Sequence, residues 1–241
     1  MKILSIGNSF STDSHKFLCR LANLNGIEIT TVNLFIGGCN LETHWKNASE
    51  NNVCYDMEIN GNDATEVVSI AYALQSDKWD VITFQQSSNL SGIYESTAPY
   101  LTDLAKYVRQ AQPQAKLYYH QTWAYETDTV HSGFLNYDKD QIKMYNCIKE
   151  TARKAANDIG AKIIPTGDVI QQLRTAKEFD YNNGGLSLCR DGYHLSNDYG
   201  RFAAAASWLH TLTEKEIICE KFDELDEKLI KLIIDTVNCL K

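Results

Sequence analysis

Five short apolar segments recur along the chain, separated by stretches long enough to include a helix. They cover residues 2–6, 27–35, 79–84, 115–120 and 162–165. Parallel strands need such crossovers, because the chain must return to the same end of the sheet before the next strand begins. The sequence therefore predicts an α/β fold. We expect a three-layer α/β/α sandwich with a flavodoxin-like, parallel, five-stranded sheet in the order 2-1-3-4-5 and right-handed crossovers.

Smaller elements are predicted between and around these strands. Residues 14–25 have the apolar periodicity of a helix, and residues 53–59 alternate like an edge hairpin with a turn at Asn60-Gly61. Residues 64–75 are expected to form a helix capped by Asn62 or Asp63. The chain has 241 residues without a repeat, a low-complexity tract or a linker. We therefore expect one domain over residues 1–241.

Charge and cysteine content limit the expected partners. Lys and Arg total 23 against 31 Asp and Glu, a net charge of −8, which disfavours nucleic acid and anionic membranes as partners. None of the seven cysteines forms a Cys-x-x-Cys pair, and the histidines form no ligand cluster. We therefore expect no metal, no cofactor and free thiols. The sequence carries no signal for an oligomeric state.

The expected localisation is cytoplasmic. No apolar run approaches the ~20 residues that span a bilayer, and the N-terminus lacks the apolar region of a secretory signal. Removal of a signal peptide from a secreted protein would leave the same sequence.

The first strand ends at Gly7-Asn8-Ser9, where a helix is expected to follow. Open α/β sheets bind ligands at this edge, so the Ser9 hydroxyl should be exposed there. Serine at a helix start is most often a cap, and a helix N-terminus can also bind a phosphate. As a nucleophile, Ser9 would need a base and a group that orients the base.

The segment Asp191-Gly192-Tyr193-His194, near the other end of the chain, offers both groups three residues apart. A turn can bring the two side chains to one point. His194 would then act as general base for Ser9, and Asp191 would orient its imidazole. A surface loop with a simple pairwise contact is the alternative.

Two other strand ends carry hydrogen-bond donors. Gly37-Gly38 follows the second strand, and Gln85-Gln86 follows the third. Acyl transfer generates an oxyanion, which preorganised N–H donors stabilise by roughly 3–4 kcal/mol each. Each block also has an ordinary explanation, as a tight turn or as a solvated strand end.

Taken together, the four blocks resemble the SGNH (GDSL-like) hydrolase superfamily. Its pattern is a nucleophile block, a glycine block, an amide block and a terminal Asp-x-x-His block, in the order found here over nearly the whole chain. The resemblance implies a serine esterase with the catalytic residues Ser9, Asp191 and His194. It also implies an oxyanion hole formed by the backbone N–H groups of Ser9 and Gly38 and an amide side chain of the third block.

Two blocks depart from the usual pattern. Asn8 stands where the family usually carries aspartate, and the third block lacks Gly-x-Asn-Asp. The segment 85–89 is instead similar to the glutamine variant of the sialate O-acetylesterase and acetylxylan-esterase branch. Gln85 is therefore expected to supply the amide, with Gln86 second and Asn89 possible if the loop doubles back. The blocks also resemble an uncharacterised bacterial subfamily of these hydrolases.

The expected function is hydrolysis of small acyl esters, with acetyl groups on carbohydrate as the substrate. The loops at the strand ends are polar and aromatic and include no long apolar groove. Trp45, Trp123 and Tyr125 lie on these loops and are expected to bind the substrate. The alternatives are a lipid or thioester hydrolase of the same superfamily and a non-catalytic, flavodoxin-like module that binds a ligand.

Overall fold

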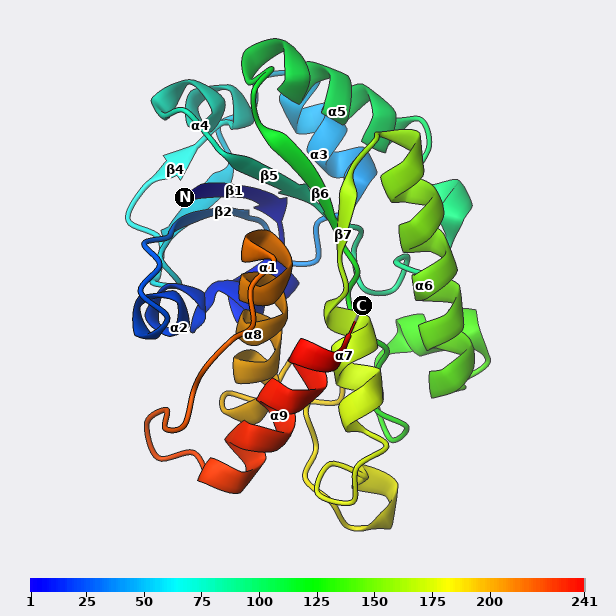
Figure 1. Ribbon diagram of the computed structural model, residues 1–241. Coiled ribbons are helices and arrows are strands. Elements are labelled where there is room, and N and C mark those ends of the chain that lie inside the picture. The colour runs from blue at the N-terminus through cyan, green and yellow to red at the C-terminus, as the bar shows by residue number, and fades with distance from the viewer. Residues whose placement is uncertain (241) are drawn as a thin grey trace.

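The structure is a computed structural model that describes residues 1–240; Lys241, the last residue of the expected domain, lies outside the described residues. One mixed sheet of seven strands forms the centre, in the order β4-β3-β2-β1-β5-β6-β7 (Figure 1). The strands are β1 (Lys2–Gly7), β2 (Thr30–Phe35), β3 (Tyr55–Ile59), β4 (Val67–Val68), β5 (Val81–Phe84), β6 (Lys116–His120) and β7 (Lys162–Ile164).

The parallel part of the sheet has the predicted order. Strands β2, β1, β5, β6 and β7 are mutually parallel, which is 2-1-3-4-5 when only parallel strands are counted. Leu4 of β1 lies between Val32 of β2 and Ile82 of β5, and all three are buried. Such apolar runs are expected where helices cover both faces of a sheet.

The predicted number of strands is wrong, because two further strands extend the same sheet. Strand β3 pairs antiparallel with β2, and β4 pairs antiparallel with β3. Tyr55 and Met57 alternate with exposed or half-buried residues along β3 and add to the core on one face. Strands β3 and β4 form the predicted edge hairpin, with a turn at Asn60-Gly61, and β3 in addition joins the hairpin to the parallel strands through β2.

Helices cover both faces of the sheet (Figure 1). α3, α4 and α5 pack together on one face, α1, α2, α7, α8 and α9 on the other, and α6 packs along β6 and β7. The α-helices are α1 (Ser9–His15), α2 (Leu18–Leu24), α3 (Leu41–Ser49), α4 (Ile70–Ser76), α5 (Tyr100–Ala111), α6 (Gln141–Asp158), α7 (Thr166–Leu173), α8 (Tyr199–Thr213) and α9 (Glu227–Cys239). The 3-10 helices are η1 (Tyr94–Ser96), η2 (Ser132–Tyr137) and η3 (Tyr181–Asn183).

Local capping explains where the early helices differ from the prediction. The helix expected over residues 14–25 is two helices, and α1 already starts at Ser9 because the Asn8 side chain accepts the N–H of Phe10. The helix expected over residues 64–75 starts later, at Ile70. Ser69 is its cap and accepts the N–H of Tyr72 at 3.2 Å, while residues 67–68 pair as β4.

Each face of the sheet has its own buried apolar cluster. Helix α8 is central to one of them and contacts α1, α2, α7 and α9. Its segment 203–206 consists of four fully buried alanines, whose small side chains allow close helix packing. Within residues 1–240, no helix combines the length and the apolar character needed to cross a membrane.

Candidate active site

The fold brings the two ends of the chain together at the carboxyl edge of the sheet. Ser9 is the first residue of α1, directly beyond β1, and His194 lies in the loop before α8. The Oγ atom of Ser9 is 2.9 Å from Nε2 of His194, and Nδ1 of His194 is 2.7 Å from Oδ2 of Asp191. Since a carboxylate only accepts, Nδ1–H donates to Asp191, and Nε2 is left to accept the Ser9 hydroxyl proton.

The Asp191 carboxylate is held by the turn that it belongs to. Its Oδ1 atom accepts the backbone N–H of Tyr193 at 3.1 Å and that of His194 at 2.7 Å. Partial burial by itself would raise the pKa of Asp191, but the hydrogen bonds from the His194 side chain and from these N–H groups outweigh it, so the pKa lies below its ordinary value. The carboxylate therefore stays charged and fixes the orientation of the imidazole.

A buried carboxylate without a predicted role joins α1, the helix that begins at Ser9, to the loop that carries His194. Asp13 lies four residues after Ser9 in α1 and is fully buried. It accepts hydrogen bonds from Arg190 Nη1 at 2.9 and 3.1 Å and from Arg201 Nε at 2.9 Å. The backbone N–H of Leu195 also donates to it, at 3.0 Å. These contacts tie both ends of the 191–194 loop to α1.

The same loop is held from its other side by the segment after β6. The N–H of Glu126 donates to the carbonyl of Gly192 at 2.8 Å. Glu126 in turn forms a buried ion pair with Arg174 at 3.0 Å, and Arg174 also donates to the carbonyl of Ala124. Because both charges are buried and paired, this clamp can keep the loop in one position.

A cavity of about 320 Å³ opens at Ser9. Phe35, the last residue of β2, and Gly38 from the loop that follows form part of its wall, and Asn89 from the loop after β5 forms another part. His131 lines it from the loop after β6. Four strand-end loops therefore converge on the Ser9 hydroxyl.

Two backbone N–H groups at this cavity are free to bind an anion. The N–H of Ser9 belongs to the first helical turn, which has no intrahelical acceptor. Gly38 has a φ of 64°, and within residues 1–240 its N–H has no hydrogen-bond partner. A side chain is strained in that backbone conformation, which accounts for glycine at this position.

The structure corrects the expectation that Gln85 supplies the oxyanion amide. Gln85 is buried, and its Nε2 donates to Oδ1 of Asn8 at 2.5 Å. Its Oε1 accepts from Ser11 Oγ at 2.7 Å and from His120 Nδ1 at 2.9 Å. Burial lowers the pKa of His120 to about 3, with a smaller contribution from His15, so its ring is neutral. Gln85 thus lies behind Ser9, where it holds Asn8, the cap of α1.

Gln86 does not face the cavity either. Its Oε1 accepts the N–H of Leu41 at 3.0 Å, and its Nε2 donates to the carbonyl and the hydroxyl oxygen of Ser96, each at 3.0 Å. Gln86 therefore joins the start of α3 to the segment after β5. These hydrogen bonds occupy both Oε1 and Nε2 of its amide.

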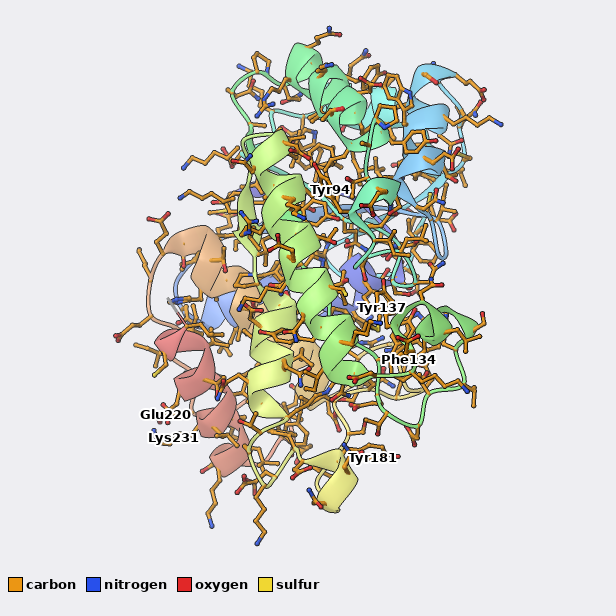
Figure 2. The ribbon with its side chains drawn as sticks, turned by 90° about the vertical axis from the view of Figure 1, so that its right-hand side faces the viewer. Tyr94, Phe134, Tyr137, Tyr181, Glu220 and Lys231 are labelled. Atoms are coloured by element: carbon orange, nitrogen blue, oxygen red, sulfur yellow. The ribbon has the colours of Figure 1, made fainter. Side chains whose placement is uncertain are left out.

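The amide at the cavity is that of Asn89. The loop doubles back after β5, because the N–H of Leu90 donates to the carbonyl of Ser87 at 3.0 Å. The carbonyl of Asn89 is held by Asn136 Nδ2 at 2.9 Å and by the Tyr137 hydroxyl at 3.2 Å. Tyr137 lies in η2, beside the first turns of α6 (Figure 2). The side-chain amide of Asn89 has no partner among the described residues and lines the cavity.

The contacts of Asn8 account for an asparagine at the position where the family usually carries aspartate. Its Oδ1 accepts the N–H of Phe10 at 3.0 Å as well as Nε2 of Gln85. Its Nδ2 donates to the carbonyl of Cys39 at 3.1 Å, one residue beyond Gly38. A carboxylate would have no donor for this carbonyl. The asparagine amide therefore links the nucleophile block, the glycine block and the amide block.

The three aromatic residues expected to bind substrate are placed elsewhere. Trp123 is fully buried, stacks on Phe10 with ring centroids 4.3 Å apart and donates to the carbonyl of Tyr193 at 2.7 Å. Tyr125 is also fully buried, and its hydroxyl is 2.7 Å from Ser88 Oγ. Trp45 is half-buried against the opposite core. The structure thus corrects these assignments: Trp123 and Tyr125 pack behind Phe10 and Ser88, which line the cavity.

The aromatic side chains that line the cavity beside His194 are Phe10, Phe35, His131 and Tyr193. None of these four was predicted to take part in the site. His131 and Tyr193 pack edge to face with ring centroids 4.7 Å apart. The ring centroids of Tyr193 and His194 are 4.2 Å apart. A clue was available in the sequence, since Tyr193 lies within the Asp191–His194 block, but nothing local indicated that His131 would reach it.

Solved structures of SGNH hydrolases share the fold of this chain. A protein from Slackia heliotrinireducens, provisionally named an SGNH hydrolase, is 22% identical with a TM-score of 0.61, over 88% of this chain and 98% of the other. An acetyl-xylooligosaccharide esterase from Geobacillus stearothermophilus is 12% identical with a TM-score of 0.52, over 88% and 92%. The predicted resemblance is thus confirmed at the level of the fold.

Residues 2–231 match the family described as Domain of unknown function (DUF4886), and the chain belongs to this family. The crystal structure of a DUF4886 family protein from Bacteroides uniformis is 38% identical. It superposes with a TM-score of 0.92 over 99% of this chain and 93% of the other. No curated protein matches the sequence significantly.

Proposed function

We propose that the protein is a serine esterase that hydrolyses small acyl esters, with acetyl esters of carbohydrates as the substrate class. The observation that carries the proposal is the hydrogen-bonded row from Asp191 through His194 to Ser9, with distances of 2.7 and 2.9 Å, at a cavity of about 320 Å³. Such a row removes the serine proton during attack, which an isolated hydroxyl cannot achieve near neutral pH.

In the proposed acylation step, Oγ of Ser9 attacks the ester carbonyl carbon, and its proton passes to Nε2 of His194. The carbonyl oxygen becomes an oxyanion, which the N–H groups of Ser9 and Gly38 and the amide of Asn89 are positioned to bind. When the bond to the alcohol oxygen breaks, His194 returns the proton to that oxygen. Asp191 remains ionised throughout and stabilises the imidazolium.

Deacylation repeats these steps with water. His194 takes a proton from water, the resulting hydroxide attacks the acyl-Ser9 carbonyl, and the carboxylic acid leaves as the proton returns to Oγ of Ser9. The reaction needs only the side chains and N–H groups of this chain and water.

Two observations support carbohydrate esters as the substrate class. The rim of the cavity combines His131 and Tyr193, so aromatic surface lies beside hydrogen-bonding groups. A protein of the same fold is named an acetyl-xylooligosaccharide esterase. Polar ligands with exposed C–H faces suit a wall of this kind.

We expect kcat/KM to fall from acetyl to butyryl to octanoyl esters. A long acyl chain gains about 0.8 kcal/mol for each CH₂ that it buries, but only if apolar surface is available. The cavity holds only about 320 Å³, and the polar residues Asn8, Ser88 and Asn89 line it together with Phe10 and Phe35. A series of 4-nitrophenyl esters measures the trend, and a rise with chain length would favour a lipid or thioester hydrolase instead.

Asn89→Ala should lower kcat by roughly 10²–10³ with little change in KM, because the oxyanion exists only in the transition state. The matched control is Asn62→Ala, which removes an exposed amide whose only partners within residues 1–240 are the carbonyls of Ile59 and Asn60 and which should keep the wild-type kcat. Steady-state kinetics on 4-nitrophenyl acetate compares the two variants. An unchanged kcat for Asn89→Ala would remove this residue from the oxyanion hole.

A further inference from the structure

We propose that His131 determines specificity for the alcohol part of the substrate, by donating a hydrogen bond from Nε2–H to a hydroxyl on the carbon next to the esterified one. This inference rests on the proposed esterase function and deepens it. The predicted substrate class is a monoester of a vicinal diol, an arrangement that acylated sugar rings contain.

The surroundings of His131 fix which ring nitrogen carries its proton. Nδ1 accepts the backbone N–H of Gly133 at 3.0 Å, so the proton of the neutral ring is on Nε2. Nε2 has no hydrogen-bond partner among the described residues, and the ring lines the same cavity as Ser9 and His194. Partial burial lowers the pKa of His131, as does nearby His194, while Asp191 opposes the shift. The ring therefore offers one donor.

The ring is also held rigidly. It packs against Tyr193 at a centroid distance of 4.7 Å and against Tyr125 at 4.9 Å. The Gly133 N–H anchors the opposite edge, at the start of η2. Gly133 is itself buried, and a Cβ there would meet Cβ of Asn89 at 2.4 Å. His131 is thus placed relative to Asn89 by backbone contacts, as a specificity residue must be.

The position of His131 indicates that it meets the alcohol rather than the acyl group. The alcohol oxygen must approach Nε2 of His194, because that atom returns the proton to it. Tyr193 contacts His194 and His131 contacts Tyr193, so these two rings extend the wall beyond His194. A hydroxyl on the carbon next to the esterified one is the part of the alcohol that can reach a second donor on this wall while the ester oxygen stays at His194.

The test compares two esters that differ by one hydroxyl: trans-2-hydroxycyclohexyl acetate and cyclohexyl acetate. We expect the wild-type protein to prefer the first by about 5- to 10-fold in kcat/KM, the size of one partly solvated hydrogen bond. Two variants remove the Nε2–H donor in different ways. His131→Asn can keep the acceptor for the Gly133 N–H, and its shorter amide places no N–H at the position of Nε2. His131→Phe keeps the aromatic contact with Tyr193.

Both variants should bring the ratio of the two kcat/KM values close to one. The ratio depends on the Nε2–H donor, and not on the hydrogen bond to the Gly133 N–H or on the aromatic contact with Tyr193. A merely structural role would change both values together and leave the ratio intact. Retention of the preference in both variants would overturn the inference, and so would equal use of both esters by the wild type. If the wild type hydrolysed neither ester nor 4-nitrophenyl acetate, the proposed function itself would fail.

Discussion

Ser9→Ala and His194→Ala should each reduce kcat for 4-nitrophenyl acetate by roughly 10⁴-fold or more, while the protein stays folded. The serine supplies the attacking oxygen, and the imidazole at 2.9 Å takes its proton, so neither group works without the other. Because the two act as one unit, the double variant should be hardly slower than the worse single variant. Steady-state kinetics and circular dichroism on all three variants measure these effects.

Ser49→Ala is a matched control, since Ser49 is an exposed serine near the end of α3 and its hydroxyl contacts only its own helix. It should keep the wild-type rate. If Ser9→Ala retained the wild-type rate, the site would not be that of a serine esterase, and a binding module that uses the start of α1 would become the better interpretation. A double variant far slower than either single variant would contradict the shared mechanism.

The sequence was sufficient to predict that Ser9, His194 and Asp191 meet. Ser9 follows the first strand directly, and the Asp191–His194 block supplies its two groups within one turn. Parallel strands expose their carboxyl ends at one edge, so the blocks that follow β1, β2 and β5 must converge there, and the loop before α8 reaches the same edge. The five parallel strands and their order were predictable for the same reason, since alternating strands and helices allow few arrangements.

The sequence could not show which way a polar side chain turns within a strand-end loop. Gln85 turns inward because Asn8, Ser11 and His120 offer it partners, and these come from two other segments of the chain. Trp123 is buried because Phe10 stacks on it. The orientation of Gln85 and the burial of Trp123 both depend on contacts between segments distant in sequence. Hydrophobic periodicity and motif spacing do not indicate such contacts.

The added strands β3 and β4 have a similar origin. Alternation over residues 53–59 correctly indicated an extended segment, but an alternating segment can pair with any available edge. The free edge of β2 lies next to it, and the antiparallel pairing of Leu34 with Met57 places a second apolar residue on the same buried face. The choice of partner was therefore decided by the assembled sheet.

Asp13 should matter both for stability and for turnover, although its carboxylate bonds to neither Ser9 nor His194. Asp13→Ala leaves the partly exposed Arg190 and Arg201 without their shared, fully buried carboxylate. Removal of one partner from a fully buried ion pair costs about 3–5 kcal/mol, and we expect a loss of unfolding free energy near the lower end of that range. Chemical denaturation measures this loss. The exposed pair between Asp235 and Lys231 provides a matched control, because Asp235→Asn should change the unfolding free energy by only about 0.5 kcal/mol.

The effect of Asp13 on turnover can be separated from its effect on stability with Asp13→Asn. The amide keeps the shape and one acceptor oxygen, but it cannot receive Arg190, Arg201 and the Leu195 N–H as a carboxylate does. The loop that carries His194 should then lose its fixed distance to Ser9, and misplacement by about 1 Å can cost 10²-fold in rate. We expect kcat to fall by roughly 10- to 100-fold, with KM nearly unchanged, at a temperature where the variant is fully folded. A folded Asp13→Asn protein with wild-type kcat would show that the 191–194 loop holds its position without this anchor. A rise in KM alone would mean that Asp13 shapes the substrate cavity rather than the position of the general base.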